Sequence, residues 1–219
     1  MNTTDEKSLF DHAVELHKSQ RFDEARKAYQ GIIDNNEQHH QALHYLGVFY
    51  AQQGKQQEAI DCYKKSIAIE PNIATPHCHL GTALNSLRQY GEALPEFQHA
   101  IEIAPDNIDA HLGLANTFKY LSREKEAEEC LSHIIEITPE HSEAHYHLGV
   151  LLSKRKIFDR AEQHYLTTLK SNPNHSGALN NLGNICMLEK RLQESCGYFR
   201  RVLEITPNHS NARSLLFNN

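Results

Sequence analysis

The 219-residue sequence contains no tryptophan, no CxxC cysteine pair and no apolar run of about 18 residues. Without such a run we expect no membrane span and no membrane partner. Five cysteines, an odd number without that spacing, predict free thiols in a reducing compartment rather than a disulfide framework. A net charge of −6 gives no reason to expect nucleic acid as a partner. The first residues lack the basic start and apolar run of a signal peptide, so we expect a cytoplasmic protein.

The sequence also lacks the short motifs of the common enzyme classes. It has no glycine-rich phosphate loop, no HExxH and no GxSxG. Cys78 lies between two histidines, but no motif supplies an oxyanion site or an orienting carboxylate for a Cys–His nucleophile. We therefore expect no catalytic residues and no cofactor.

What the sequence does contain is a 34-residue repeat. The stretch 40–73 shows it most clearly, and its Leu-Gly pair, its alanine and its proline return at a constant period without an insertion. The proline, for example, recurs as Pro71, Pro105, Pro139, Pro173 and Pro207. A register kept in this way predicts a repeat architecture in which each unit contacts only its neighbours.

Each repeat contains two stretches with the period of an α-helix. In the repeat 40–73, small and apolar residues three and four apart mark one helix face over 43–50 and another over 59–67. Gly54 predicts the end of the first helix and Pro71 the end of the second, so each repeat is predicted to be a helical hairpin. Three serines just before a periodic run are predicted helix N-caps: Ser142, Ser176 and Ser210.

The period also predicts the organisation of the chain. We expect an N-terminal tail over 1–5, a repeat array over 6–209, and a final segment over 210–219. The predicted repeats are 6–39, 40–73, 74–107, 108–141, 142–175 and 176–209. The final segment, about two helical turns long, is either a short capping helix or the start of a truncated continuation.

With His40 as column 1, the repeat resembles the tetratricopeptide repeat family. The shared columns are Leu-Gly at 7 and 8, Leu or an aromatic residue at 11 and 24, Ala at 20 and Pro at 32. The resemblance covers about residues 6–217. It implies an all-α fold, a right-handed α-solenoid of about six helical hairpins plus a short C-terminal helix. The first helices of such an array line a concave groove that binds peptide segments of other proteins.

The resemblance places columns 2, 5, 9 and 12 of the first helices in the groove. Columns 5 and 9 give the candidate peptide-binding residues: Phe10, His44, Val48, Cys78, Thr82, Leu112, Asn116, Tyr146, Val150, Asn180 and Asn184. Neither column contains Lys or Arg, so we do not expect the carboxylate clamp that family members use for Hsp70 and Hsp90 tails. A neutral groove is predicted, in which asparagine amides hold a peptide backbone. The alternative is that these amides bond to neighbouring turns.

Sixteen histidines raise the question of a metal site. Four of them recur at column 34, a full repeat apart, which is typical of a turn position and not of a ligand cluster: His39, His141, His175 and His209. We therefore predict no metal site. Three others share column 4, where the family favours Trp: His77, His111 and His145. Stacked at successive interfaces, these three would form a pH-sensitive seam.

The leading hypothesis is a non-catalytic scaffold that binds a protein or peptide partner. A first alternative is the substrate-recruiting arm of a larger enzyme such as a glycosyltransferase, because the stretch 178–184 resembles repeats that precede O-linked glycosyltransferase domains. A second is a self-assembling scaffold, in which Leu215, Leu216 and Phe217 pack on the first repeat of another copy.

Overall fold

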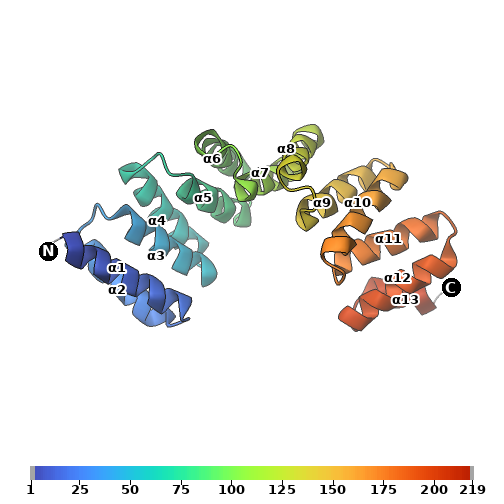
Figure 1. Ribbon diagram of the computed structural model, residues 1–219, viewed down its shortest axis with the longest axis horizontal. Coiled ribbons are helices and arrows are strands. Elements are labelled where there is room, and N and C mark those ends of the chain that lie inside the picture. The colour runs from blue at the N-terminus through green and yellow to red at the C-terminus, as the bar shows by residue number, and fades with distance from the viewer. Residues whose placement is uncertain (1–2, 218–219) are drawn as a thin grey trace. The chain divides into compact units, whose positions relative to one another are not determined.

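The computed structural model describes the backbone of residues 3–217 and the side-chain surroundings of residues 6–210 and 212–214. All regular structure in that part of the chain is α-helical (Figure 1). The chain divides into two compact units, unit 1 ending at Ser122 and unit 2 beginning at Arg123, and each is described by itself.

The helices follow one another at the period of the sequence repeat. Unit 1 contains α1 (Thr3–Lys18), α2 (Phe22–Asn35), α3 (His40–Gln52), α4 (Gln56–Ile69), α5 (Ala74–Ser86), α6 (Tyr90–Ile103) and α7 (Ile108–Tyr120). Unit 2 contains α8 (Glu124–Ile137), α9 (Ser142–Lys154), α10 (Phe158–Ser171), α11 (Ser176–Leu188), α12 (Leu192–Ile205) and α13 (Ser210–Phe217).

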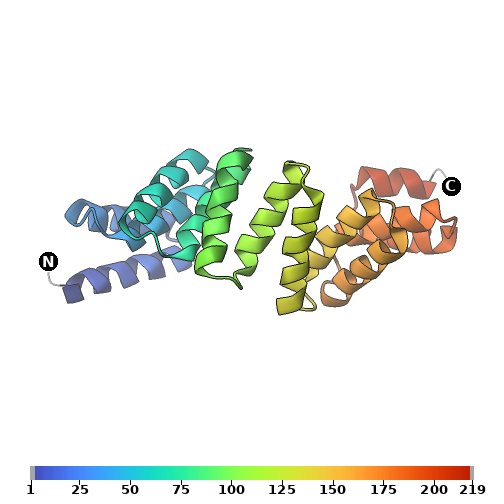
Figure 2. The same cartoon turned by 90° about the horizontal axis from the view of Figure 1, so that it is seen from above.

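Consecutive helices pack as hairpins, as the repeat predicts. In unit 1, α1 packs on α2, α3 on α4 and α5 on α6, and α7 follows against α5 and α6 (Figure 2). In unit 2, α9 packs on α10 and α11 on α12, with α13 against α12. Each hairpin also contacts the next, so the apolar core of each unit runs lengthwise through the stack. The prediction of an all-α solenoid built from helical hairpins is confirmed.

The two ends differ in detail from the expected organisation. Helix α1 begins at Thr3, earlier than the start near Glu6 that the repeat suggests. Helix α13 occupies the position of the expected short C-terminal helix. The side chains of Leu215, Leu216 and Phe217, on which the self-assembly alternative depends, lie outside the described residues.

The turn inside each hairpin contains one residue in the left-handed region. It is always the middle residue of a three-residue turn, with φ between 59° and 74°. The positions are Gln20, Gly54, Arg88, Ser122, Lys156 and Lys190. Only one of them is the glycine that such a conformation favours. The sequence therefore predicted the end of a first helix only at Gly54, whereas a left-handed residue ends the first helix of every repeat.

The predicted serine N-caps are wrong by one residue. The N-caps of α9 and α11 are His141 and His175, whose Nδ1 atoms accept hydrogen bonds from backbone N–H groups three residues on, at 3.2 and 3.1 Å. His39 and His209 make the same bond. An imidazole nitrogen with a free lone pair can replace the usual carboxylate or hydroxyl oxygen. The column-34 histidines are therefore caps, which explains their strict period.

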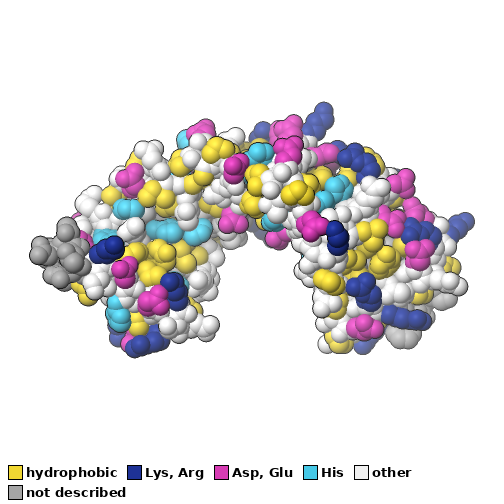
Figure 3. All heavy atoms as spheres, viewed as in Figure 1, with side chains coloured by type: hydrophobic (Ala, Val, Ile, Leu, Met, Phe, Trp, Pro, Cys, Tyr) yellow, Lys and Arg dark blue, Asp and Glu magenta, His cyan; other side chains and the backbone are white. Residues whose placement is uncertain are grey.

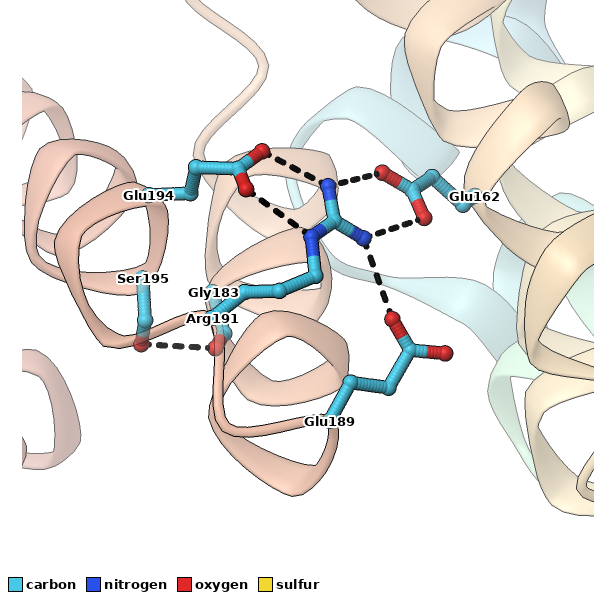
Figure 4. A network of polar contacts seen from close by, with 6 residues as sticks. All are labelled: Glu162, Gly183, Glu189, Arg191, Glu194 and Ser195. Atoms are coloured by element: carbon cyan, nitrogen blue, oxygen red, sulfur yellow. Dashed lines mark hydrogen bonds and ion pairs between the residues drawn. The ribbon is translucent and has the colours of Figure 1, made fainter.

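Small residues allow the helices of a hairpin to approach each other. A Cβ atom added to Gly183 would lie 2.7 Å from Cε1 of Phe199, a fully buried ring in the partner helix. Alanine fills column 20 in five of the six repeats and is buried in each. In the sixth, Ser195 replaces it and donates its hydroxyl proton to the carbonyl oxygen of Gly183 at 2.9 Å (Figure 4). The buried hydroxyl is thus satisfied.

One arginine joins the last two complete hairpins of unit 2. Arg191, in the turn before α12, donates two hydrogen bonds to Glu162 of α10 at 2.8 and 2.9 Å (Figure 4). It also bonds to Glu189 and Glu194. Because the guanidinium presents a planar fork of donors, it can satisfy these carboxylates together, and they hold the pKa of Arg191 well above its ordinary value.

Candidate peptide-binding site

Unit 1 contains two adjoining cavities on the face formed by α1, α3 and α5. The larger, about 560 Å³, is lined by Val14, His17, Lys18, Gln20, Phe22, Tyr45, Val48, Gln52 and Gln53. The smaller, about 300 Å³, is lined by Val48, Ala51, Gln52, Gln56, Tyr63, His79, Thr82, Ala83 and Ser86. Both are lined by Val48 and Gln52, so the two cavities adjoin, and together they are called the unit 1 groove below.

The unit 1 groove is nearly free of charge. Among the lining residues only Lys18 carries a full charge, and its ammonium lies 2.9 Å from the carboxylate of Glu15. Amide and hydroxyl side chains such as Gln52, Gln56 and Thr82 provide neutral hydrogen-bonding groups. Figure 3 shows histidine and hydrophobic side chains gathered over α3, α4 and α5.

The predicted residues of unit 1 lie in different environments. Val48 and Thr82 line the groove, and Phe10, His44 and Leu112 are half-buried. Cys78 is only 5% exposed, and burial raises the pKa of its thiol to about 12. A buried, protonated thiol offers neither a peptide contact nor a nucleophile. We therefore remove Cys78 from the candidate surface.

A continuous set of aromatic rings lies beneath this face. Phe10 packs on Tyr45 with ring centroids 5.5 Å apart, and Tyr45 packs on both Tyr29 and His44. The rings continue through His44, Tyr63 and His79 at 5.8 Å each. Because these rings come from column 5, column 24 and column 6 of successive repeats, they tie the first three hairpins together. Column 6, which supplies Tyr45 and His79, was missing from the sequence prediction.

Two imidazoles meet at the centre of this set. Nε2 of His44 and Nδ1 of His79 are 2.9 Å apart, with ring planes 19° from parallel. Burial, and next the neighbouring His79, lower the pKa of His44 to about 4. Burial also lowers the pKa of His79. Both rings are therefore neutral at physiological pH, and this part of the surface adds no charge.

The side chain of Asn116 makes a hydrogen bond within its own helix, α7. Its side-chain oxygen accepts a hydrogen bond from the ammonium of Lys119 at 3.0 Å. Lys119 occupies column 12, one of the columns that the family resemblance places in the groove. Burial lowers the pKa of Lys119. Reading column 12 along the chain would have found both Lys119 and His17.

Unit 2 holds the remaining predicted residues. Tyr146 and Val150 lie one turn apart on α9, and Asn180 and Asn184 lie one turn apart on α11, all half-buried. Tyr146 packs against His175 with centroids 4.4 Å apart. The neighbouring Asn181 donates to the Tyr165 hydroxyl at 3.1 Å.

The column-4 histidines act on the linkers between repeats. His77, His111 and His145 each donate through Nε2 to the carbonyl oxygen of the preceding proline, at 3.0, 2.8 and 2.9 Å. The other nitrogen of His77 meets Glu96 at 2.7 Å, and that of His145 meets His164 at 2.8 Å. The common feature is a bond to the linker.

No helix within residues 3–217 is long and apolar enough to cross a membrane. Among the described residues no group of three or more His, Cys, Asp or Glu side chains is placed to hold a metal ion.

Comparison with solved structures identifies the fold. PilF of Pseudomonas aeruginosa superposes with a TM-score of 0.86 at 13% identity, covering 98% of this chain and 97% of that one. PilW, a type IV pilus biogenesis factor, gives 0.86 at 15% identity, covering 99% and 100%. YrrB, described as a TPR protein with an unusual peptide-binding site, gives 0.67 at 20% identity, covering 86% and 97%. At these identities the likeness concerns the fold alone.

Comparison with curated protein sequences found no match. Three family models do match, described as tetratricopeptide repeat over 84–151, TPR repeat over 47–87 and tetratricopeptide repeat over 151–210. They follow one another along the chain, and the first includes both helices on either side of the boundary between the two units. The hairpins, their period and these matches agree: the chain belongs to the tetratricopeptide repeat family.

Proposed function

We propose that this chain is a non-catalytic interaction scaffold that binds an extended, uncharged peptide segment of a partner protein in the unit 1 groove. One observation carries the proposal: two adjoining cavities share Val48 and Gln52, and their lining contains one charged side chain, Lys18, already paired with Glu15. A charged segment would lose hydration there without gaining a partner, whereas an apolar segment loses little.

The lining suits a peptide in two ways. Val48, Phe22 and Tyr45 offer apolar contact for side chains of the segment. Gln52, Gln56 and Thr82 offer donors and acceptors for its backbone, independent of its sequence. The aromatic set beneath the groove holds the helices in place, so binding needs little reordering of the scaffold.

The second half of the predicted surface belongs to the same proposal. Tyr146, Val150, Asn180 and Asn184 of unit 2 provide an apolar and amide-bearing surface of similar chemistry. YrrB, a TPR protein with an unusual peptide-binding site, supports a peptide as the kind of ligand. The enzyme-arm and self-assembly alternatives, and the cytoplasmic location, stay predictions.

Selection of displayed peptides tests the proposal. A library of random twelve-residue peptides is selected on the wild-type protein, and the enriched peptides are tested on two variants. V48E places a carboxylate in the unit 1 groove. A68E places one at an exposed position of α4 that is not part of either cavity lining.

We expect enriched peptides that are apolar and near neutral, bind A68E like the wild type, and lose at least about tenfold in affinity for V48E. Equal binding to V48E would contradict the proposed site. Enrichment of acidic C-terminal peptides would contradict the neutral-groove argument.

A further inference from the structure

We propose that His44 and His79 together bind one divalent transition-metal ion of the Cu²⁺ or Ni²⁺ class on the face of unit 1. When histidines are compared only within one column or one helix, the sequence predicts no metal site. His44 and His79 come from different columns of successive repeats, on α3 and α5, and only the fold brings them together. The inference does not depend on peptide binding.

The two nitrogens are close enough to reach one ion. They lie 2.9 Å apart, the distance of the hydrogen bond between the rings, and metal–nitrogen bonds of about 2.0–2.1 Å span such a pair after a modest rotation of each ring. Imidazole is a favoured ligand of both Cu²⁺ and Ni²⁺, and Cu²⁺ binds nitrogen ligands most tightly among the divalent first-row ions.

The protonation state also suits metal binding. A histidine must present an unprotonated nitrogen to a metal, and the hydrogen bond between the two rings requires that one of these two nitrogens is unprotonated. One proton now lies between the two nitrogens. For both lone pairs to reach one ion, the rings turn outward and that proton moves to the other nitrogen of the same ring. The pair therefore loses a hydrogen bond but releases no proton.

The surroundings leave room for the remaining ligands. His79 lines the cavity of about 300 Å³, which can hold coordinated water. His40 and Asp109 lie close enough to act on the two rings electrostatically, and the acidic Asp109 favours a cation. No third His, Cys, Asp or Glu completes a cluster among the described residues. The protein thus supplies two ligands and water supplies the rest.

Unit 2 contains a matched control pair. Nδ1 of His145 and Nδ1 of His164 are 2.8 Å apart. His145 is only 7% exposed, and its other nitrogen is held by the carbonyl oxygen of Pro139, so it cannot turn outward. Arg160 places a positive charge near His164. We therefore expect no metal ion at this pair, although its nitrogens are equally close.

Copper titration of the full chain tests the proposal. Cu²⁺ is added at substoichiometric amounts in the presence of a weak competing chelator, and pulsed EPR counts the imidazoles bound to it. NMR then shows which histidine ring signals are broadened by the paramagnetic ion. We expect two imidazoles on one ion, and loss of the His44 and His79 ring signals before all others.

Three variants complete the test: H44Q, H79Q and the control H164Q, each checked for folding by circular dichroism. We expect H44Q and H79Q to weaken Cu²⁺ binding about tenfold or more and H164Q to leave it unchanged. Wild-type affinity in H44Q and H79Q would overturn the proposal. So would early broadening of other rings. If H44Q and H79Q do not fold, the test rests on the wild-type NMR pattern and on its persistence in H164Q.

Discussion

At the scale of the residue, the histidines of this chain act through the particular nitrogen that each presents. Those at column 34 accept from a helix N-terminus through Nδ1, and those at column 4 donate to a proline carbonyl through Nε2. The sequence period identified both columns but not these roles. Which ring nitrogen meets a donor or an acceptor depends on atoms from other helices and linkers, and a column of one-letter codes does not contain that information.

His77 differs from the other column-4 histidines because both of its nitrogens face acceptors. Nε2 meets the Pro71 carbonyl oxygen and Nδ1 meets the Glu96 carboxylate at 2.7 Å. Both nitrogens can donate only in the charged imidazolium. The hydrogen bond to Glu96, and then the one to Pro71, raise the pKa of His77 above its ordinary 6.5. The pair is thus a source of pH-dependent stability.

Replacing Glu96 with Gln tests this pair. Because the folded pKa of His77 is raised, its stabilisation is complete below the unfolded pKa of about 6.5 and is lost as pH rises through the folded value. We expect E96Q to lower the free energy of unfolding by about 1–2 kcal/mol at pH 5.5 and by less at pH 8.5. Urea denaturation at both pH values measures the difference. E58Q, at an exposed glutamate of α4, is the control.

A difference between wild type and E96Q that does not change with pH would contradict the charged pair. The original expectation, a seam of three stacked column-4 histidines, predicts a pH response spread over His77, His111 and His145. The geometry instead predicts acid-side stabilisation at His77, whose Nδ1 lies 2.7 Å from the Glu96 carboxylate.

At the scale of the element, the repeat is maintained by one close contact and one turn. The close contact is between a glycine at column 8 and an aromatic ring at column 24, as in Gly47 with Tyr63 and Gly183 with Phe199. The sequence shows that small residues recur there. It could not identify which side chain requires the space, because that depends on the packing of two helices.

The hairpin of α11 and α12 offers a matched pair of glycines. In G183A the new methyl group would lie 2.7 Å from the buried ring of Phe199, so the ring or the helix must shift. In G197A nothing lies within 4 Å of the new methyl group. We expect G183A to lower the free energy of unfolding by about 1–3 kcal/mol, and G197A to raise it by up to about 1 kcal/mol. Thermal and urea unfolding measure both changes in stability. Equal effects of the two substitutions would contradict the close contact between Gly183 and Phe199.

The left-handed turn gives a second prediction at this scale. Lys156 has φ of 61°, a conformation that costs a residue with a side chain about 1 kcal/mol. We expect K156G to raise the free energy of unfolding by about 0.5–1 kcal/mol, and G54A to lower it by about as much. Urea unfolding of both variants measures this, with Q163G, at an exposed position in the middle of helix α10, as a control that should destabilise. Destabilisation by K156G would show that the side chain matters more than the backbone.

At the scale of the whole molecule, the sequence predicts the fold more completely than it predicts the residues of the candidate site. The helices, the prolines that end them and the all-α solenoid follow from recurring residues, because each repeat needs the same helix faces. The site rests on residues that vary between repeats. Val48 and Thr82 do line the unit 1 groove, but Cys78 is buried and Asn116 is bonded to Lys119. Exposure and bonding at such positions depend on the neighbouring repeat, which a single column does not describe.

The neutrality of the unit 1 groove is the central claim at this scale. Its lining holds apolar side chains, neutral amides and hydroxyls, two histidines and one paired lysine. Binding that relies on apolar contact and neutral hydrogen bonds should be insensitive to salt, because screening acts on charges. This separates the proposal from recognition of an acidic tail, which would weaken steeply as salt rises.

The most direct test is isothermal titration of one selected peptide into wild type, V48E and A68E at about 50 and 500 mM salt. We expect wild type and A68E to share one Kd that changes less than about twofold with salt, and V48E to bind at least about tenfold more weakly. Binding to V48E with the wild-type Kd, or a wild-type Kd that rises more than about tenfold with salt, would contradict a neutral peptide-binding groove at Val48.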